Sequence, residues 1–342
     1  MIEMSLDDMI KYFPSTINHY RSALNKNEQL IYDHLRSGLL KYSSQITISE
    51  ISIARIQTIY DYIRLDNPYI FFVRSLSVKQ NTSNNTTVIF PDYRFSIDKT
   101  KITMYSLLTT CRNIIKTIRS QSILETEKNI HDYLCKNVKY DYLYAESSFE
   151  CIGPLLFHKG VCEGISKSAK IIMDLLQINS FVQYGYACNS RINNGNKTDS
   201  HAWNIVFISP YYYHCDITFD LSLKYNDLLR YDYFNISDQE ILIDHSWDRS
   251  LTMPCTFSLN YYNSHNLLFK SLYEVDHFIS SSIIQRKRNI IFQLTNAMSM
   301  TAWEKLISVS LEKNILKEML YCQYELSINE PRFIVQIFIQ YL

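Results

Sequence analysis

Residues 159–180 read KGVCEGISKSAKIIMDLLQINS. Apolar residues recur at helical spacing up to Leu176, which predicts a helix whose first turn holds Cys162. The unpaired N–H groups and the positive dipole end of such a helix stabilise a thiolate and can hold an oxyanion. Gly160 and Gly164 flank the cysteine and would let a substrate backbone approach closely. A buried cysteine at the start of a core helix explains this segment equally well.

A second segment holds a histidine and a carboxylate that could act together with Cys162. Residues 199–220 read DSHAWNIVFISPYYYHCDITFD, and their alternation predicts two antiparallel strands joined by a turn near Ser209. Regular pairing about a turn centred between Ile208 and Ser209 would place His201 directly opposite Asp216, within side-chain reach. The carboxylate would then bind one imidazole nitrogen and leave the other facing the thiol. Taken singly, the two side chains also fit a satisfied sheet histidine and a strand-end carboxylate.

Three short runs together resemble a known family. They are GVCEG at 160–164, HAWN at 201–204 and HCDITFD at 214–220. They resemble the core of the transglutaminase-like superfamily, and in particular its bacterial, Firmicutes-type transglutaminase-like and cysteine-peptidase members. The resemblance covers about residues 125–220. It implies a Cys–His–Asp catalytic triad. Canonical animal members of the family use calcium, but this sequence shows no acidic calcium loop, so no cofactor and no metal are expected.

The resemblance assigns a role to individual residues of this chain. It implies Cys162 as the nucleophile, His201 as the base and Asp216 as the carboxylate that orients the base. Trp203 and Thr218 match family neighbours that shape the site.

Further candidates lie close to these residues in the sequence. Tyr140 and Tyr142 lie upstream of the nucleophile, where the family carries a side-chain oxyanion donor. His214 is two residues before Asp216, so in a regular strand it would share the same face and could reach the site. Cys215 would point to the other face and into the core.

The sequence predicts an α+β fold with a papain/transglutaminase-like core, in which the nucleophile helix packs on an antiparallel sheet, with flanking α/β modules. Turn residues and changes in the local sequence pattern divide the chain into four parts. They are an N-terminal segment (1–25), an N-terminal α/β module (26–120), a transglutaminase-like catalytic core (121–250) and a C-terminal α+β lobe (251–342).

Composition excludes several classes of protein. Lys and Arg together number 34, as do Asp and Glu, so no net charge attracts nucleic acid. The N-terminus lacks the basic and apolar regions of a signal peptide, and no apolar run is long enough to span a membrane. These features predict a soluble, cytoplasmic protein. The 8 cysteines form no CxxC pair, which argues against a zinc knuckle or a thioredoxin-like motif. Because no export signal is seen, most of them are expected to be reduced.

The triad predicts cysteine-dependent acyl transfer on peptide or carboxamide substrates through a thioester. Water as the acceptor gives a peptidase, an amidase or a Gln/Asn deamidase, and an amine gives a protein crosslinker. Hydrolysis is favoured over protein transamidation, because the sequence has no acidic calcium loop and carries extra flanking modules. The alternative is an inactive transglutaminase-fold module that binds or scaffolds a partner. A metal site built from Cys162, His201, His214 and Asp216 is a weaker hypothesis, since no spacing is diagnostic of one.

Overall fold

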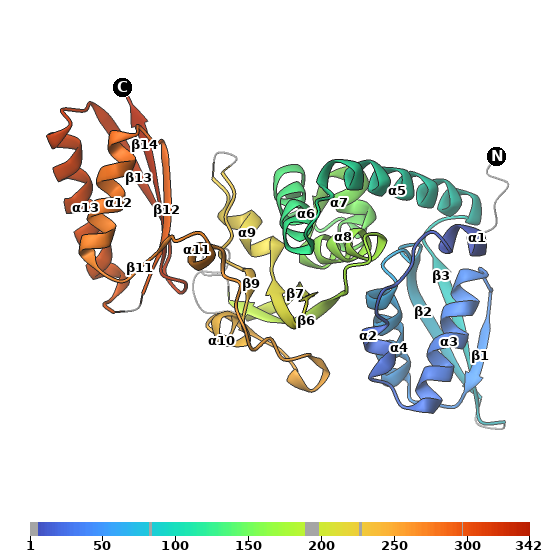
Figure 1. Ribbon diagram of the computed structural model, residues 1–342. Coiled ribbons are helices and arrows are strands. Elements are labelled where there is room, and N and C mark those ends of the chain that lie inside the picture. The colour runs from blue at the N-terminus through green and yellow to red at the C-terminus, as the bar shows by residue number, and fades with distance from the viewer. Residues whose placement is uncertain (1–5, 82–83, 189–197, 226–227, 296) are drawn as a thin grey trace.

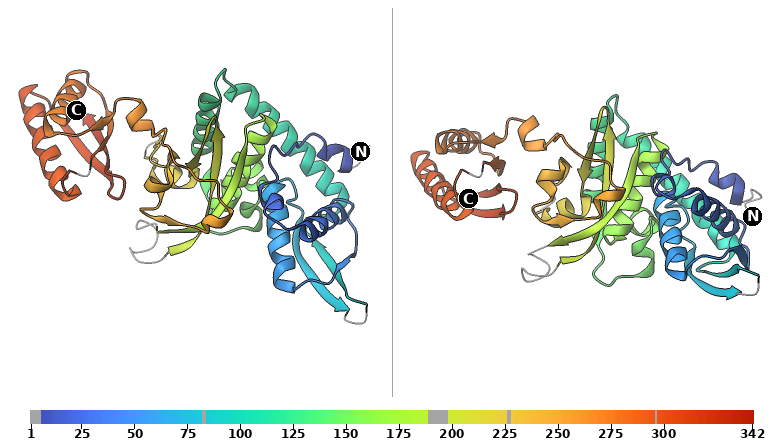
Figure 2. Two further views of the ribbon diagram at one scale, coloured as in Figure 1. Left: turned by 60° about the horizontal axis from the view of Figure 1, so that its bottom comes forward. Right: turned by 90° about the horizontal axis from the view of Figure 1, so that it is seen from below.

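The computed structural model describes residues 6–81, 84–188, 198–225, 228–295 and 297–342. Helices and mainly antiparallel sheets alternate along these residues, which confirms the α+β class. Three sheets of three, five and four strands follow one another along the chain. The first and third lie at opposite ends of the molecule, with the five-stranded sheet between them (Figures 1 and 2).

The N-terminal part packs helices on a small antiparallel sheet of strand order β1-β3-β2. Its elements are α1 (Leu6–Ile10), α2 (His19–Ser22), α3 (Lys26–Leu40), β1 (Ile46–Ser49), α4 (Ile53–Asp66), β2 (Val73–Asn81), β3 (Thr86–Tyr93) and α5 (Ile97–Ile118). Helix α3 begins at a capping box between Asn25 and Glu28, and Ser52 and Ser96 cap α4 and α5. Helix α5 runs from this sheet toward the central part of the molecule (Figure 1).

The central part holds the candidate residues. Its elements are α6 (Ile123–Asn137), β4 (Lys139–Tyr140), η1 (Glu146–Phe149), α7 (Ile152–Phe157), β5 (Lys159–Gly160), α8 (Cys162–Leu175), β6 (Ser180–Cys188), β7 (Thr198–Ile208), β8 (Tyr211–Cys215), α9 (Ile217–Leu223), β9 (Phe234–Ile236), α10 (Asp238–Ile241), β10 (His245–Ser246) and η2 (Arg249–Leu251). The sheet order is β10-β6-β7-β8-β9, with every pair antiparallel. Helix α8 packs on this sheet: Asn204 in β7 donates to the Ser166 carbonyl, and the Ser166 hydroxyl donates to the Ala202 carbonyl.

In the C-terminal part, two helices cover one face of a third sheet. Its elements are α11 (Tyr261–Ser264), β11 (Leu268–Phe269), α12 (Leu272–Ile284), β12 (Asn289–Leu294), α13 (Met300–Lys317), β13 (Cys322–Asn329) and β14 (Ile334–Tyr341). The strand order is β11-β12-β14-β13. Helices α12 and α13 lie together on the same side of this sheet (Figure 1).

Buried apolar side chains form two large clusters. One runs from Leu6 to Phe234 and joins the N-terminal part to the central part, whereas the other joins Val275 to Ile339 within the C-terminal part. The C-terminal lobe therefore has an apolar core of its own. The domain boundaries drawn from the sequence stay predictions. Within the described residues, no helix combines the length and apolar character that crossing a membrane requires.

Candidate active site

Cys162 is the first residue of α8, as the helical spacing predicts, and its side chain is half-buried. Val161 stands at the N-cap with an extended backbone (φ −94°, ψ 176°), and its apolar side chain makes no capping hydrogen bond. The first-turn N–H groups of α8 thus lack the side-chain acceptor that usually caps a helix. The positive end of the helix dipole can therefore stabilise a negative charge at Cys162.

The two glycines beside Cys162 are needed for packing within the chain. A Cβ atom on Gly164 would lie 2.1 Å from the carbonyl oxygen of Ser148, and one on Gly160 would lie 2.5 Å from Cγ of Pro154. Neither glycine lines the cavity at Cys162. The two glycines therefore let α8 pack against η1 and let β5 pack against α7, and their role in admitting a substrate backbone stays a prediction.

The predicted register of the histidine and carboxylate strands is wrong. Strands β7 and β8 pair with Ile208 opposite Tyr211, so the turn is centred one residue later than predicted, and β8 ends at Cys215. Asp216 is the N-cap of α9, and its Oδ1 accepts from the backbone N–H groups of Thr218 and Phe219. The segment from Ile217 onward is a helix, where a strand was predicted.

His201 and Asp216 nevertheless meet. Nε2 of His201 lies 2.6 Å from Oδ2 of Asp216, and both side chains are buried. Since Nε2 is occupied, Nδ1 is the imidazole nitrogen that remains for the Cys162 thiol, which lies within hydrogen-bonding reach of the ring. The three predicted triad residues therefore come together, with the acid carried by a helix cap.

Electrostatics favour an ion pair at this histidine. Burial opposes its charged form, but attraction to Asp216 and hydrogen bonds to Asp216 and Cys162 raise the pKa of His201 to about 10. Burial likewise opposes ionisation of Asp216, yet the imidazole of His201 and a hydrogen bond from His245 hold its pKa below the usual range. The carboxylate is therefore charged at neutral pH, and His201 keeps its proton.

Trp203 and His214 lie behind His201. The Trp203 ring stacks on His201 with 5.9 Å between ring centroids, and its Nε1 donates to Nδ1 of His214. Nε2 of His214 binds Asp238 at 2.7 Å. His214 is buried and does not line the cavity, so it contacts Trp203 instead of the reacting groups. Cys215 is buried in the core, as predicted.

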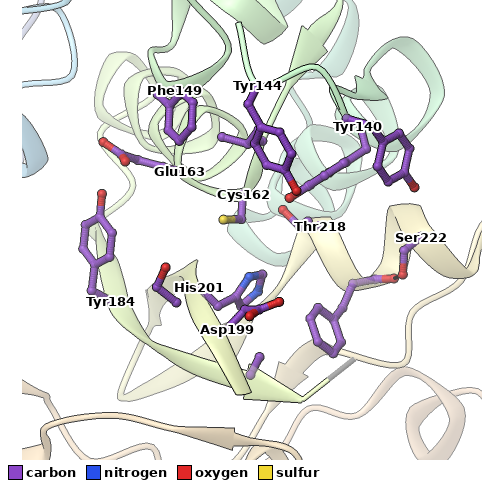
Figure 3. Close-up of a pocket in the computed structure, with 15 residues that line it drawn as sticks. Tyr140, Tyr144, Phe149, Cys162, Glu163, Tyr184, Asp199, His201, Thr218 and Ser222 are labelled. Atoms are coloured by element: carbon purple, nitrogen blue, oxygen red, sulfur yellow. Dashed lines mark hydrogen bonds between the residues drawn. The ribbon is translucent and has the colours of Figure 1, made fainter. Parts of the chain in front are cut away.

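Cys162 and His201 line a cavity of about 410 Å³. Tyr144 and Phe149, from the loop and short helix after β4, lie on one side of Cys162, and His201 lies on the other (Figure 3). The Tyr140 ring also lines the wall, as do Tyr142, Tyr184, Asp199 and Thr218. The cavity is thus rich in tyrosine, and its charged walls are Glu163, Asp199 and His201.

A buried ion network surrounds the residue that follows the cysteine. The carboxylate of Glu163 lies 2.6 Å from Nζ of Lys167 and 3.1 Å from Nη2 of Arg64. The same two cations contact Glu150 at 2.9 and 2.7 Å. Burial opposes ionisation of Glu163, but Lys167 and Arg64 lower its pKa. Its negative charge is therefore balanced next to Cys162, by groups that sequence patterns did not single out.

His245 is a second residue that the sequence did not single out. Its Nε2 lies 3.0 Å from Oδ2 of Asp216, the same oxygen that binds His201. Strand β10 places it there by pairing His245 with Ala187 of β6. No local sequence signal marks this contact, because the two partners are 29 residues apart.

Among the described residues, two groups of side chains have possible metal-ligand atoms within 4.8 Å of one another. They are His201, Asp216 and His245, and His214, Asp238 and Cys255. His214 thus lies apart from the four-residue metal set considered from the sequence. Hydrogen bonds link both histidines to Asp216 in the first group and His214 to Asp238 in the second. In the second, the Trp203 N–H occupies Nδ1 of His214, which leaves Nε2 as its protonated nitrogen.

Comparison with known proteins agrees with the motifs. Residues 109–217 match the family model of the transglutaminase-like superfamily. A crystal structure of a TGase is 15% identical, with a TM-score of 0.27, over 51% of this chain and 50% of the other. A candidate cysteine protease from Cytophaga hutchinsonii is 14% identical, with a TM-score of 0.28, over 42% of this chain and 61% of the other. The match therefore spans about half to three-fifths of these two chains. No curated protein matches the chain.

The matched segment contains helix α8 with Cys162, strand β7 with His201, and Asp216 at the start of α9. Residues 109–217 of this chain are therefore similar to the transglutaminase-like superfamily.

Proposed function

We propose that Cys162, His201 and Asp216 catalyse cysteine-dependent acyl transfer on peptide or carboxamide substrates, with hydrolysis as the reaction. The carrying observation is the position of His201, which binds Asp216 through Nε2 at 2.6 Å and leaves Nδ1 for a thiol that lines an accessible cavity. The superfamily match supports a cysteine-dependent acyl transferase or peptidase in general. Hydrolysis and the roles of the three residues are the finer proposal.

The chemistry follows from these positions. The Cys162 thiolate attacks the substrate carbonyl carbon, and the first-turn N–H groups of α8 stabilise the oxygen that becomes negative. The His201 imidazolium donates its proton to the departing amine as the carbon–nitrogen bond breaks, which leaves a thioester on Cys162. His201 then takes a proton from water, and the hydroxide attacks the thioester and releases an acid. The reaction consumes only substrate and water.

A product assay separates the possible acceptors. Fluorescently labelled casein and glutamine- or asparagine-containing peptides are incubated with the wild-type chain, with and without dansylcadaverine. We expect new amino termini or released ammonia, and little incorporated amine. Cys162→Ala should give none of these products. Amine incorporation that dominates would replace hydrolysis by transamidation. If no probe reacts and Cys162 is inert to alkylation, the chain is a binding module.

Tyr140 is the candidate side-chain donor to the oxyanion. Burial, and then the nearby Cys162, raise its pKa, so its hydroxyl stays protonated and can donate. Removing one such donor costs about 100-fold in rate. We therefore expect Tyr140→Phe to lower kcat by about that factor, with little change in KM. Tyr142→Phe, at a rim side chain that is 65% exposed, should change kcat less than about threefold and is the matched control. Equal effects of the two changes would remove Tyr140 from the mechanism.

A further inference from the structure

One carboxylate oxygen of Asp216 accepts from two imidazoles. His201 lies 2.6 Å from Oδ2 and His245 lies 3.0 Å from it, with 5.4 Å between the two ring centroids. The other oxygen, Oδ1, accepts from two N–H groups at the start of α9. Each oxygen therefore has two donors, and the carboxylate cannot rotate without losing one of them. A mechanism that uses only Cys162, His201 and Asp216 gives no role to the second donor on Oδ2, which is His245.

His245 is itself held in place from its far side. Its Nδ1 lies 2.6 Å from Oδ1 of Asp244, and the hydroxyl of Tyr233 donates to Oδ2 of the same carboxylate. Tyr233 in turn contacts the C-terminal lobe, where the Arg332 guanidinium lies 5.8 Å from its ring centroid. His245 is 3% exposed and does not line the cavity. It therefore has no direct access to a substrate.

We propose that His245 is a positioning residue, which donates from Nε2 to Asp216 and so fixes the carboxylate against His201. This inference rests on the proposed function, because it assigns a partner to the same triad. A charged acceptor in a buried site needs donors on all sides, and a hydrogen bond to a charged group is among the stronger ones. Without His245, Oδ2 would keep only His201 as a partner, and the carboxylate could turn away from the position that orients the imidazole.

Two substitutions of similar size separate this role from packing. In His245→Gln the amide N–H can still donate to Asp216, whereas His245→Leu has no donor. We expect His245→Leu to lower kcat, and the rate of Cys162 alkylation by iodoacetamide near pH 6.5, about tenfold or more. KM should not change. His245→Gln should keep at least about a third of both rates. His277→Leu, at an exposed histidine in α12, is the control for a surface substitution.

Tyr233→Phe provides a milder test, since it removes only the hydroxyl that holds Asp244. It should lower the same two rates by a smaller factor without a loss of folded protein. Equal rates in His245→Gln and His245→Leu would overturn the positioning role and assign His245 to packing. Wild-type Cys162 that alkylates no faster than the other cysteines would overturn the proposed function itself. The two failures are therefore distinguishable.

Discussion

Asp216→Asn is expected to lower kcat by about 1,000- to 10,000-fold while the chain remains folded. The asparagine oxygen can still cap α9, but its amide N–H groups would face Nε2 of His201 in place of a carboxylate oxygen. The imidazole would then place its proton on Nδ1, toward Cys162, and could not accept the thiol proton. The substitution would also remove the negative charge of Asp216, which stabilises the imidazolium form of His201. Steady-state kinetics on the probe that gives product will measure this loss.

Asp132→Asn is the matched control for that experiment. Asp132 also contacts a buried histidine, with 3.1 Å between its Oδ1 and Nδ1 of His131, but it does not line the cavity at Cys162. Its replacement should change kcat less than about threefold. A similar loss in both variants would mean that a general effect on the fold explains the result, and the role of Asp216 would be lost.

Lys167→Met is expected to lower the free energy of unfolding by about 3–5 kcal/mol. The Lys167 side chain is fully buried, and its Nζ contacts Glu150, Glu163 and the carbonyl oxygen of Phe149. Its removal leaves Arg64 as the remaining cation in hydrogen-bond contact with both carboxylates. Breaking a buried pair by removing one partner is costly, because the other charge stays desolvated.

Urea unfolding followed by near-ultraviolet circular dichroism checks this prediction. The control is Lys313→Met, because Lys313 is 64% exposed beside a partly buried Asp276 (32%), and this solvent-screened pair should contribute less than about 1 kcal/mol. The two apolar clusters can unfold separately, so the transition that includes Trp203 is the one to compare. A Lys167→Met protein as stable as Lys313→Met would contradict the importance of the buried network.

Local patterns predicted the parts of the site that depend on short stretches of chain. The helix at Cys162 followed from apolar spacing, and the meeting of His201 with Asp216 followed from two neighbouring segments. The register failed because the turn is centred one residue later than assumed and the strand stops at Cys215. Aspartate is among the preferred N-cap residues, so the run from Asp216 could also have been interpreted as a helix start.

Long-range packing decided the remaining features. His245 reaches Asp216 only because β10 pairs with β6, and neither strand marks the other in the sequence. Gly164 has no room for a side chain, because a Cβ atom would meet the carbonyl oxygen of Ser148 in the short helix η1. Arg64 reaches Glu163 from α4 of the N-terminal part, 99 residues away. Such contacts depend on how separate elements dock, which periodicity and motif spacing do not encode.

Alkylation of Cys162 tests the central claim most directly. Iodoacetamide is added between pH 5 and 9, and labelling of each cysteine is followed by mass spectrometry in the wild type and in His201→Ala. Cys188 and Cys322 are half-buried like Cys162 and provide internal references. An activated thiolate should be labelled faster than both references below about pH 7, and His201→Ala should abolish that advantage. Labelling of Cys162 at the rate of the references in the wild type would contradict the Cys–His pair and the acyl transfer proposed from it.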